Sequence, residues 1–251
     1  MPYCFSKGGG VVVSGQSQIM RLLMHQPSPV IWHRSKEGTV LAVQTDKDAP
    51  LWLWISNPCV ISEYRALIEL LPKWEPKVVI TNSMEIHQVL PNLRQVTAIH
   101  ELSGVPSPQV LRELPNSARL STPRSAYWAS VMSLVQQSRG CSSIEAACVV
   151  DEFFACPEAY LMLSKTDTVL SKAEWSLSTE HLGFISNLEC TASFDGVVSL
   201  THLVNSLTNR VLHTRRKPVF CVDIRDELAL CALALNNIHI INTYYVWEVL
   251  S

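Results

Sequence analysis

The pattern of hydrophobic and polar positions is most regular between residues 175 and 247, where short apolar runs alternate with periodic stretches. The run Leu182–Cys190 is apolar enough for a buried strand, and it stops at the polar turn Thr191–Gly196. From Val198 to His213 apolar residues recur three and four positions apart, which predicts a helix with one apolar face. The rest of this region predicts a strand at Pro218–Val222, a helix at Glu227–Leu235 and a closing strand at Asn242–Trp247.

The residues before this region predict two helices and a set of antiparallel strands. Amphipathic patterns cover 124–138 and 142–154, after a short strand at Ala118–Ser121. Two apolar runs, Tyr160–Leu163 and Leu170–Leu177, flank a polar turn. Together with Leu182–Cys190 they predict an antiparallel meander that leads into the long helix.

The first part of the chain alternates between predicted strands and helices, which is typical of an α/β domain. Polar, proline-bearing stretches at 103–108 and 114–117 interrupt the pattern. We therefore predict two domains, residues 1–117 and 118–251. The elements expected in the first are strands at Thr39–Gln44, Leu51–Ile55 and Lys77–Thr81 and helices at Gln18–Met24, Ser62–Leu71 and from Ser83.

Amino-acid composition and net charge limit the kinds of partner that this protein can bind. The 251 residues are 47% hydrophobic and 17% charged, as in a globular protein, and the formal net charge is −2. Such a charge favours neither nucleic acid nor an anionic membrane surface. No apolar run reaches the roughly 20 residues of a membrane span. The eight cysteines show no CxxC or zinc-type spacing, so we expect no metal site and reduced thiols in the cytoplasm.

Four features of the second half carry a family resemblance: Trp175 on the strand before the central one, the central strand Leu182–Cys190, the Gly196 turn with its helix, and the Trp247 strand. On these features the chain resembles the GNAT acyltransferase superfamily. The stretch Ile144–Leu163 is similar to its glycine N-acyltransferase-like branch. The resemblance implies a mixed α+β sheet in a C-terminal GNAT fold, preceded by a smaller, degenerate GNAT-like α/β domain.

The resemblance also implies acyl-CoA, either acetyl-CoA or a longer thioester, as co-substrate and a small-molecule amine as acceptor, for example an amino acid such as glycine. The phosphate-loop pattern of the family, Q/R-x-x-G-x-G/A, falls on 193–198 and keeps Gly196 alone. A helix N-terminus suits a pyrophosphate because its first amides are unpaired and its dipole end is positive. The competing interpretation is a plain strand-to-helix connection. The expected cofactor-binding residues are Asn187, Leu188, Gly196, Val197, Val198, Ser199 and Leu200.

The resemblance also points to positions for the catalytic acid and base. The family's general base on the central strand falls at or next to Leu182, and His181 and Glu180 adjoin it. A histidine with a pKa near 6.5 could deprotonate an amine through water, but His181 could equally be a solvated residue at the start of the strand. Glu189 is a weaker candidate because it lies near the turn. The usual acid position is occupied by Leu233.

Other positions of the pattern differ too. The asparagine expected at the start of the last helix falls on Arg225 or Asp226. An acceptor carboxylate would need a cation, for which Arg119 and Arg124 are candidates. The leading hypothesis is an acyl-CoA-dependent N-acyltransferase of the cytoplasm, or of mitochondria by resemblance. The alternatives are a GNAT-like protein that binds acyl-CoA or a protein partner without turnover, and an unrelated α/β scaffold.

Overall fold

The computed structural model describes residues 30–34, 40–44, 52–55, 76–82, 86, 90, 92–106 and 118–250. These described residues divide into two compact units: one holds those between 102 and 240, and the other holds those between 30 and 101 together with 241–250. Two strands, β5 (Leu93–Gly104) and β11 (Ile238–Val249), have residues in both units. Each unit is therefore described by itself.

The sheet of the first unit carries its strands in the order β5-β10-β9-β8-β7-β6. Four of them form antiparallel neighbours: β6 (Arg119–Ser121), β7 (Ala159–Leu163), β8 (Val169–Ser178) and β9 (Leu182–Cys190). The strand β10 (Lys217–Asp223) runs parallel to β9. A parallel neighbour needs a crossover connection, which the long helix α6 (Phe194–His213) provides.

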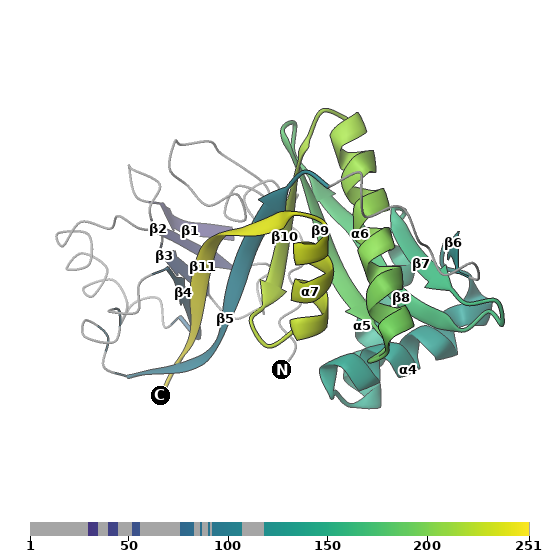
Figure 1. Ribbon diagram of the computed structural model, residues 1–251. Helices are drawn as coiled ribbons and strands as arrows, with labels where there is room; N and C mark the ends of the chain where they lie inside the picture. Colours follow the sequence, from purple (N-terminus) through teal and green to yellow (C-terminus); the bar gives the residue numbers. More distant parts are fainter. Residues whose placement is uncertain are drawn as a thin grey trace. The chain divides into compact units, whose positions relative to one another are not determined.

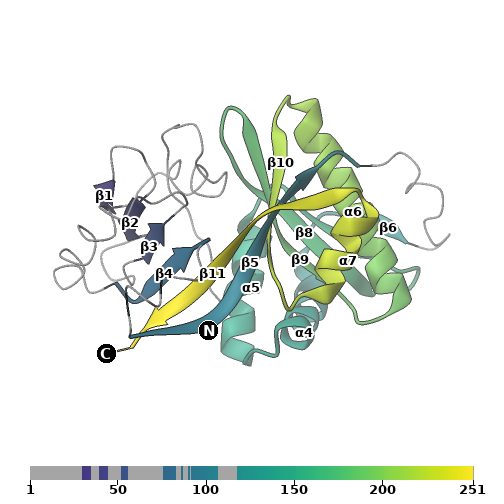
Figure 2. The same cartoon turned by 60° about the vertical axis from the view of Figure 1, so that its left-hand side comes forward.

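Helices cover both faces of this sheet (Figure 1; Figure 2). A 3-10 turn at Ser125–Tyr127 precedes α4 (Trp128–Arg139) and α5 (Ser143–Ala155), which pack on one face, and α6 and α7 (Glu227–Leu235) pack on the other. Alternation along β7 explains this division. Leu161 and Leu163 join the core with α4 and α5, whereas Tyr160 and Met162 join the core with α6.

The second unit contains the strand order β1-β2-β3-β4-β11-β5, in which β1 is Val30–Arg34, β2 Val40–Gln44, β3 Trp52–Ile55 and β4 Val78–Thr81. The C-terminal strand β11 pairs antiparallel with β4, and Trp247 is opposite Val79. It therefore lies between β4 and β5, although these two strands follow each other along the chain. Leu53, Val79 and Trp247 share a buried cluster there.

Most expected elements of the second half are confirmed. The strand Leu182–Cys190 has the predicted bounds, and the helix Glu227–Leu235 does as well. The long helix starts four residues earlier than expected, at Phe194, because Ser193 caps it. The closing strand is longer than predicted, and the twelve-residue strand β5 was not predicted.

In the first part, β2, β3 and β4 match predicted strands, and β1 was not expected. The helices predicted at 18–24 and 62–71 lie outside the described residues. Within the described part of the chain, no helix has the length and apolarity needed to cross a membrane. The same residues contain no group of three or more His, Cys, Asp or Glu side chains arranged to hold a metal ion.

Candidate functional site

The parallel strands β9 and β10 are paired over only part of their length. Their ladder runs from Leu182 opposite Lys217 to Ile185 opposite Phe220. Both strands belong to the described part of the chain, and there residues 186–190 and 221–223 form no pair with one another (Figure 1). The sheet is therefore open from Ser186 onward, and backbone groups of β9 on that side need other partners.

An irregularity of β9 lies at the start of this opening. Opposite β8, Glu174 pairs with Ser186 and Lys172 pairs with Glu189, so β9 has one residue more than β8 over this interval. Asn187 has a φ of 52°, a left-handed conformation that asparagine tolerates better than most residues. This is a β-bulge, and it turns two consecutive side chains, Ser186 and Asn187, toward the same carboxylate.

That carboxylate is Glu174 of β8, which is 7% exposed. Its Oε1 accepts hydrogen bonds from Ser186 Oγ at 3.1 Å and from Asn187 Nδ2 at 2.8 Å. Its Oε2 is buried and has no hydrogen-bond partner among the described residues. Burial raises the pKa of Glu174, against the lowering effects of Lys172 and of the two hydrogen bonds. The group is thus a partly satisfied acid that holds a proton more readily than a solvated one.

A second hydroxyl extends this set. Ser176 Oγ lies 2.8 Å from Ser186 Oγ, and both serines are half-buried. Because an ionised Glu174 can only accept, the Ser186 hydroxyl donates to it, and the Ser176 hydroxyl then donates to Ser186. The result is a directed chain of hydrogen bonds from Ser176 through Ser186 to Glu174.

A cluster of charges lies on the same face of the sheet. Arg139, the last residue of α4, donates from Nε to Glu189 Oε1 at 2.6 Å and from Nη2 to Asn187 Oδ1 at 2.7 Å. Lys172 is fully buried, with Nζ at 3.4 Å from Glu189 Oε1 and 4.7 Å from the ring centre of Phe153. The two cations thus flank one carboxylate, and Arg139 also holds the bulge through Asn187.

The charges of this cluster shift the pKa values of Glu189 and Lys172. Burial acts to raise the pKa of Glu189, but the charges of Lys172 and Arg139 outweigh it, so the pKa is lowered and the group stays ionised. Burial lowers the pKa of Lys172, and Glu189 opposes that change. Glu174, in contrast, receives hydrogen bonds only from neutral donors. The cluster therefore contains two different carboxylates: Glu189 forms ion pairs with Arg139 and Lys172, whereas Glu174 accepts hydrogen bonds from Ser186 and Asn187.

The turn before α6 requires a glycine at position 196 because there is no room for a side chain. A Cβ on Gly196 would lie 2.1 Å from the carbonyl oxygen of Thr191, so no side chain fits. The Gly196 amide donates to Ser193 Oγ at 3.0 Å, and the Val197 amide donates to the Ser193 carbonyl at 3.1 Å. Within the described residues, the first-turn amides without an acceptor are those of Phe194 and Asp195, and both residues are exposed.

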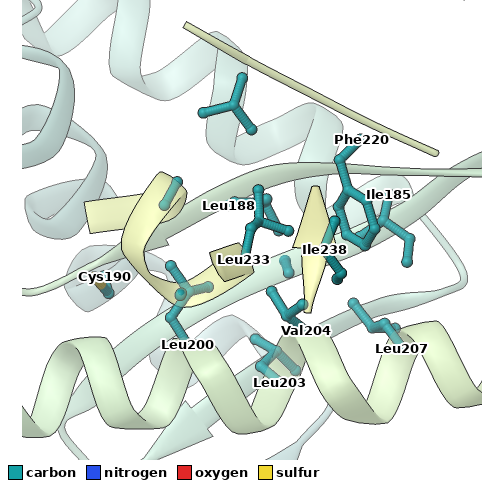
Figure 3. Close-up of a cluster of buried hydrophobic side chains, with 14 of the residues drawn as sticks. Ile185, Leu188, Cys190, Leu200, Leu203, Val204, Leu207, Phe220, Leu233 and Ile238 are labelled. Carbon is teal, nitrogen blue, oxygen red and sulfur yellow. The ribbon is translucent and has the colours of Figure 1, made fainter. Parts of the chain in front are cut away.

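The remaining residues expected to bind a cofactor lie in several environments. Val197 and Val198 are half-buried in the first turn of α6. The Ser199 hydroxyl is buried and bonds to Ser171 Oγ and to the Gly196 carbonyl. Leu200 belongs to the core, which Figure 3 shows between α6 and the strands. Leu188, on β9, lies in that same core.

The two residues expected to act as bases lie at the closed end of the strand pair. His181 and Glu180 are exposed at the turn between β8 and β9, and the His181 carbonyl accepts a hydrogen bond from the Lys217 amide. Leu182, which follows them, is buried. Ser186 lies four positions after Leu182, or about 13 Å along a strand. The structure therefore does not bring His181 and Glu180 to the opening.

The expected acid position, Leu233, is fully buried in the core of α6, α7 and β9 (Figure 3). Asp226 caps α7 by accepting from the Ala229 amide, and burial raises its pKa. Cys190 at the end of β9 is buried too. Burial, followed by the charges of Asp226 and its neighbours, raises the pKa of this thiol to about 12, so it is not a nucleophile at neutral pH.

The arginines expected to hold an acceptor carboxylate are distant from the opening. Arg119 of β6 pairs with Asp167 in the turn between β7 and β8, and Arg124, five residues later, is exposed. Three strand spacings separate β6 from β9, which is about 14 Å. Arg139 is the cation that the fold brings to the bulge.

The sequence contained a signal for the residues that were missed. Lys172, Glu174 and Ser176 alternate with apolar or aromatic neighbours, so a strand places all three on one face. Charged residues on an inward face of a central strand are rare unless they are paired or functional. No such signal existed for Arg139, because its partners lie 48 and 50 residues away.

Comparisons with known proteins identify the fold. Solved structures with the same architecture include a GNAT-family acetyltransferase from Colwellia psychrerythraea, with a TM-score of 0.56, 10% identity, and coverage of 89% of this chain and 85% of that one. A GCN5-related N-acetyltransferase from Sphaerobacter thermophilus gives 0.58, 14%, 87% and 80%, and one from Kribbella flavida gives 0.58, 11%, 89% and 90%. No protein-family model and no curated protein sequence matches the chain. The chain has a GNAT fold.

Proposed function

We propose that this protein is an acyl-CoA-dependent N-acyltransferase that transfers an acyl group to a small-molecule amine. The observation that carries the proposal is the end of the β9–β10 ladder at Ile185 and Phe220, directly before the Asn187 bulge. The solved structures of similar fold are named acetyltransferases, which agrees with an acyl group as the group transferred.

The opening suits an extended ligand that carries amide groups. Residues 187–190 of β9 have no strand partner on the β10 side within the described chain, and an amide-containing pantetheine arm would add to that edge as a strand does. Its phosphates would lie toward the turn 191–196, where the amides of Phe194 and Asp195 and the positive end of α6 favour anions. Asn187 and Leu188 would contact the arm.

Alignment of the bound thioester and amine would supply most of the rate acceleration. Alignment of two bound reactants contributes about 7–11 kcal/mol, whereas a general acid or base contributes roughly 10²–10⁴-fold. The loss of the family's acid at Leu233 is therefore compatible with slow transfer. His181 and Glu180 stay predicted bases, to be tested by alanine substitution. The acceptor is an amine, and an amino acid such as glycine is one candidate.

The test is calorimetric titration with acetyl-CoA and with benzoyl-CoA, followed by thiol-release assays with glycine and a panel of other amines. The proposal predicts heat with at least one thioester and amine-dependent thiol release. No heat with either thioester would exclude the proposal. Binding without thiol release across the panel would favour instead a GNAT-like protein that binds acyl-CoA without turnover.

A further inference from the structure

We infer that Ser186 takes the proton from the acceptor amine and passes its own to Glu174, while Ser176 orients the Ser186 hydroxyl. The inference rests on the proposed function and deepens it, because it assigns the proton transfer of that reaction to residues of β8 and β9. Ser186 would touch the substrate and be a catalytic residue. Glu174 and Ser176 would act through it as positioning residues.

The Ser186 hydroxyl can accept one more hydrogen bond than the protein gives it. A hydroxyl offers one proton to donate and two lone pairs to accept. The proton goes to Glu174 Oε1 at 3.1 Å, and one lone pair receives the Ser176 hydroxyl at 2.8 Å. One lone pair remains, and Ser186 is half-buried rather than enclosed. An amine N–H is the kind of donor that completes this set.

Ser186 lies at the position in the sheet where the strands β9 and β10 separate. It is the first residue of β9 beyond the last pair with β10, so its backbone lies where the opening begins. A thioester whose pantetheine arm runs along 187–190 would end near this residue. His181 and Glu180 lie at the other end of the paired segment, about 13 Å away along the strand from Leu182 to Ser186. A base is needed within hydrogen-bond reach of the amine.

The step is balanced without another reactant. The amine nitrogen forms a bond to the thioester carbonyl carbon, and the C–S bond breaks to release the CoA thiolate. The amine proton moves to Ser186 Oγ as the hydroxyl proton of Ser186 moves to Glu174 Oε1. The proton on Glu174 then returns through Ser186 to the thiolate or to solvent, which gives the amide, the free thiol and an ionised Glu174.

The surroundings of Glu174 suit a reversible proton acceptor. Among the described residues, the charged groups that act on Glu174 or Glu189 include Lys172 on the same strand, Arg139 on α4 and Glu152 on α5. Arg139 and Lys172 both pair with Glu189, whereas at Glu174 burial outweighs the lowering effect of Lys172 on the pKa, and Glu152 raises that pKa further. Glu174 therefore accepts a proton at lower cost than Glu189, and its buried Oε2 has no partner among the described residues.

The experiment measures kcat/KM against pH for the full chain with acetyl-CoA and the best amine of the panel. Ser186→Ala and Glu174→Gln are each expected to lower kcat/KM by roughly 10²-fold, and Ser176→Ala by roughly tenfold. The acetyl-CoA dissociation constant should change by less than about threefold in each variant. Ser186→Thr keeps a hydroxyl and should restore most of the rate. Ser130→Ala, an exposed serine on α4, is the matched control.

The pH profile separates a relay from a structural role. In the natural protein kcat/KM should fall toward acid pH as Glu174 becomes protonated, and this acid limb should be absent in Glu174→Gln. Full activity of Ser186→Ala, or an unchanged acid limb in Glu174→Gln, would overturn the relay while the transferase proposal stands. Acetyl-CoA binding without turnover of any amine would overturn the relay and the transferase activity together, and would leave acyl-CoA binding alone. Failure of the natural protein to bind acetyl-CoA would overturn both.

Discussion

Arg139 and Glu189 join the end of α4 to the unpaired part of β9, with the guanidinium Nε donating to Glu189 Oε1 at 2.6 Å. The carboxylate is 5% exposed, and its second cation, Lys172, is fully buried. Through Asn187 the same guanidinium also holds the bulge. One arginine thus couples the helical layer to the segment of β9 where we propose that acyl-CoA binds.

We predict that Arg139→Met lowers the free energy of unfolding by about 2 kcal/mol, because a buried carboxylate then keeps only Lys172 as a charged partner. Urea denaturation followed by circular dichroism measures this. A double-mutant cycle with Glu189→Gln should give a coupling energy of about 1 kcal/mol or more. Independent effects of the two substitutions would show that the pair does not stabilise the protein.

Gly196→Ala should destabilise the fold by about 2 kcal/mol, since its Cβ would collide with the Thr191 carbonyl. The measurement is the same denaturation experiment, with Ala192→Gly in the exposed turn as control. A loss of acetyl-CoA affinity in Gly196→Ala or Gly196→Trp would then not identify a phosphate contact. Unchanged stability would mean that the turn can move away from Thr191.

Val198→Ala is the sharper test of phosphate binding at α6. The substitution removes two methyl groups from a half-buried position in the first turn and restores the G-x-A spacing of the family pattern. Acetyl-CoA should bind more tightly, by on the order of 1 kcal/mol, as measured by calorimetry. Equal or weaker binding would argue against phosphate contact at this turn.

Glu174→Gln should make the protein more stable at neutral pH than the natural sequence. The folded-state pKa of Glu174 is raised from 4.5, chiefly by burial, so its contribution to stability is present below that value and is lost as pH rises through the folded pKa. Glutamine keeps an oxygen for Ser186 and Asn187 and has no charge to bury. The difference in unfolding free energy between the two proteins should vanish below about pH 4.5. A pH-independent difference would contradict the raised pKa.

A buried amide network fixes α7 against α6. Asn236 is fully buried, donates to the carbonyls of Thr201 and Ala232 at 2.8 and 2.9 Å, and accepts from Asn205 Nδ2 at 3.1 Å. Asn236→Ala should cost about 2–3 kcal/mol because it leaves these groups unsatisfied. Asn209→Ala, half-buried at the end of the same network, should cost about 1 kcal/mol in the same urea denaturation experiment. Equal costs would contradict this ordering.

The sequence predicted the elements whose apolar period is unambiguous. The strand Leu182–Cys190 and the apolar stripe of α6 could be read directly, and both form the core shown in Figure 3. The start of α6 was placed late because Phe194, which begins the helix, is exposed and adds nothing to the periodicity. Strand β5 was missed because several polar residues lie between its apolar ones.

The candidate site could be predicted only in part, because it depends on long-range pairing. A bulge shifts the strand register by one residue, and this is what turns Ser186 and Asn187 to the same side as Glu174. Nothing in the order of residues 182–190 reveals it. The bases expected from the resemblance were chosen by alignment to Leu182, which lies in the paired segment rather than at the opening.

The central claim is that acyl-CoA binds along the unpaired part of β9, and amide hydrogen exchange measured by NMR with and without acetyl-CoA tests it most directly. We predict slower exchange for amides within Asn187–Cys190 when acetyl-CoA is added, and little change at Gly183–Ile185, where β9 is already paired on both sides. Unchanged exchange at 187–190 with saturating acetyl-CoA would contradict the claim.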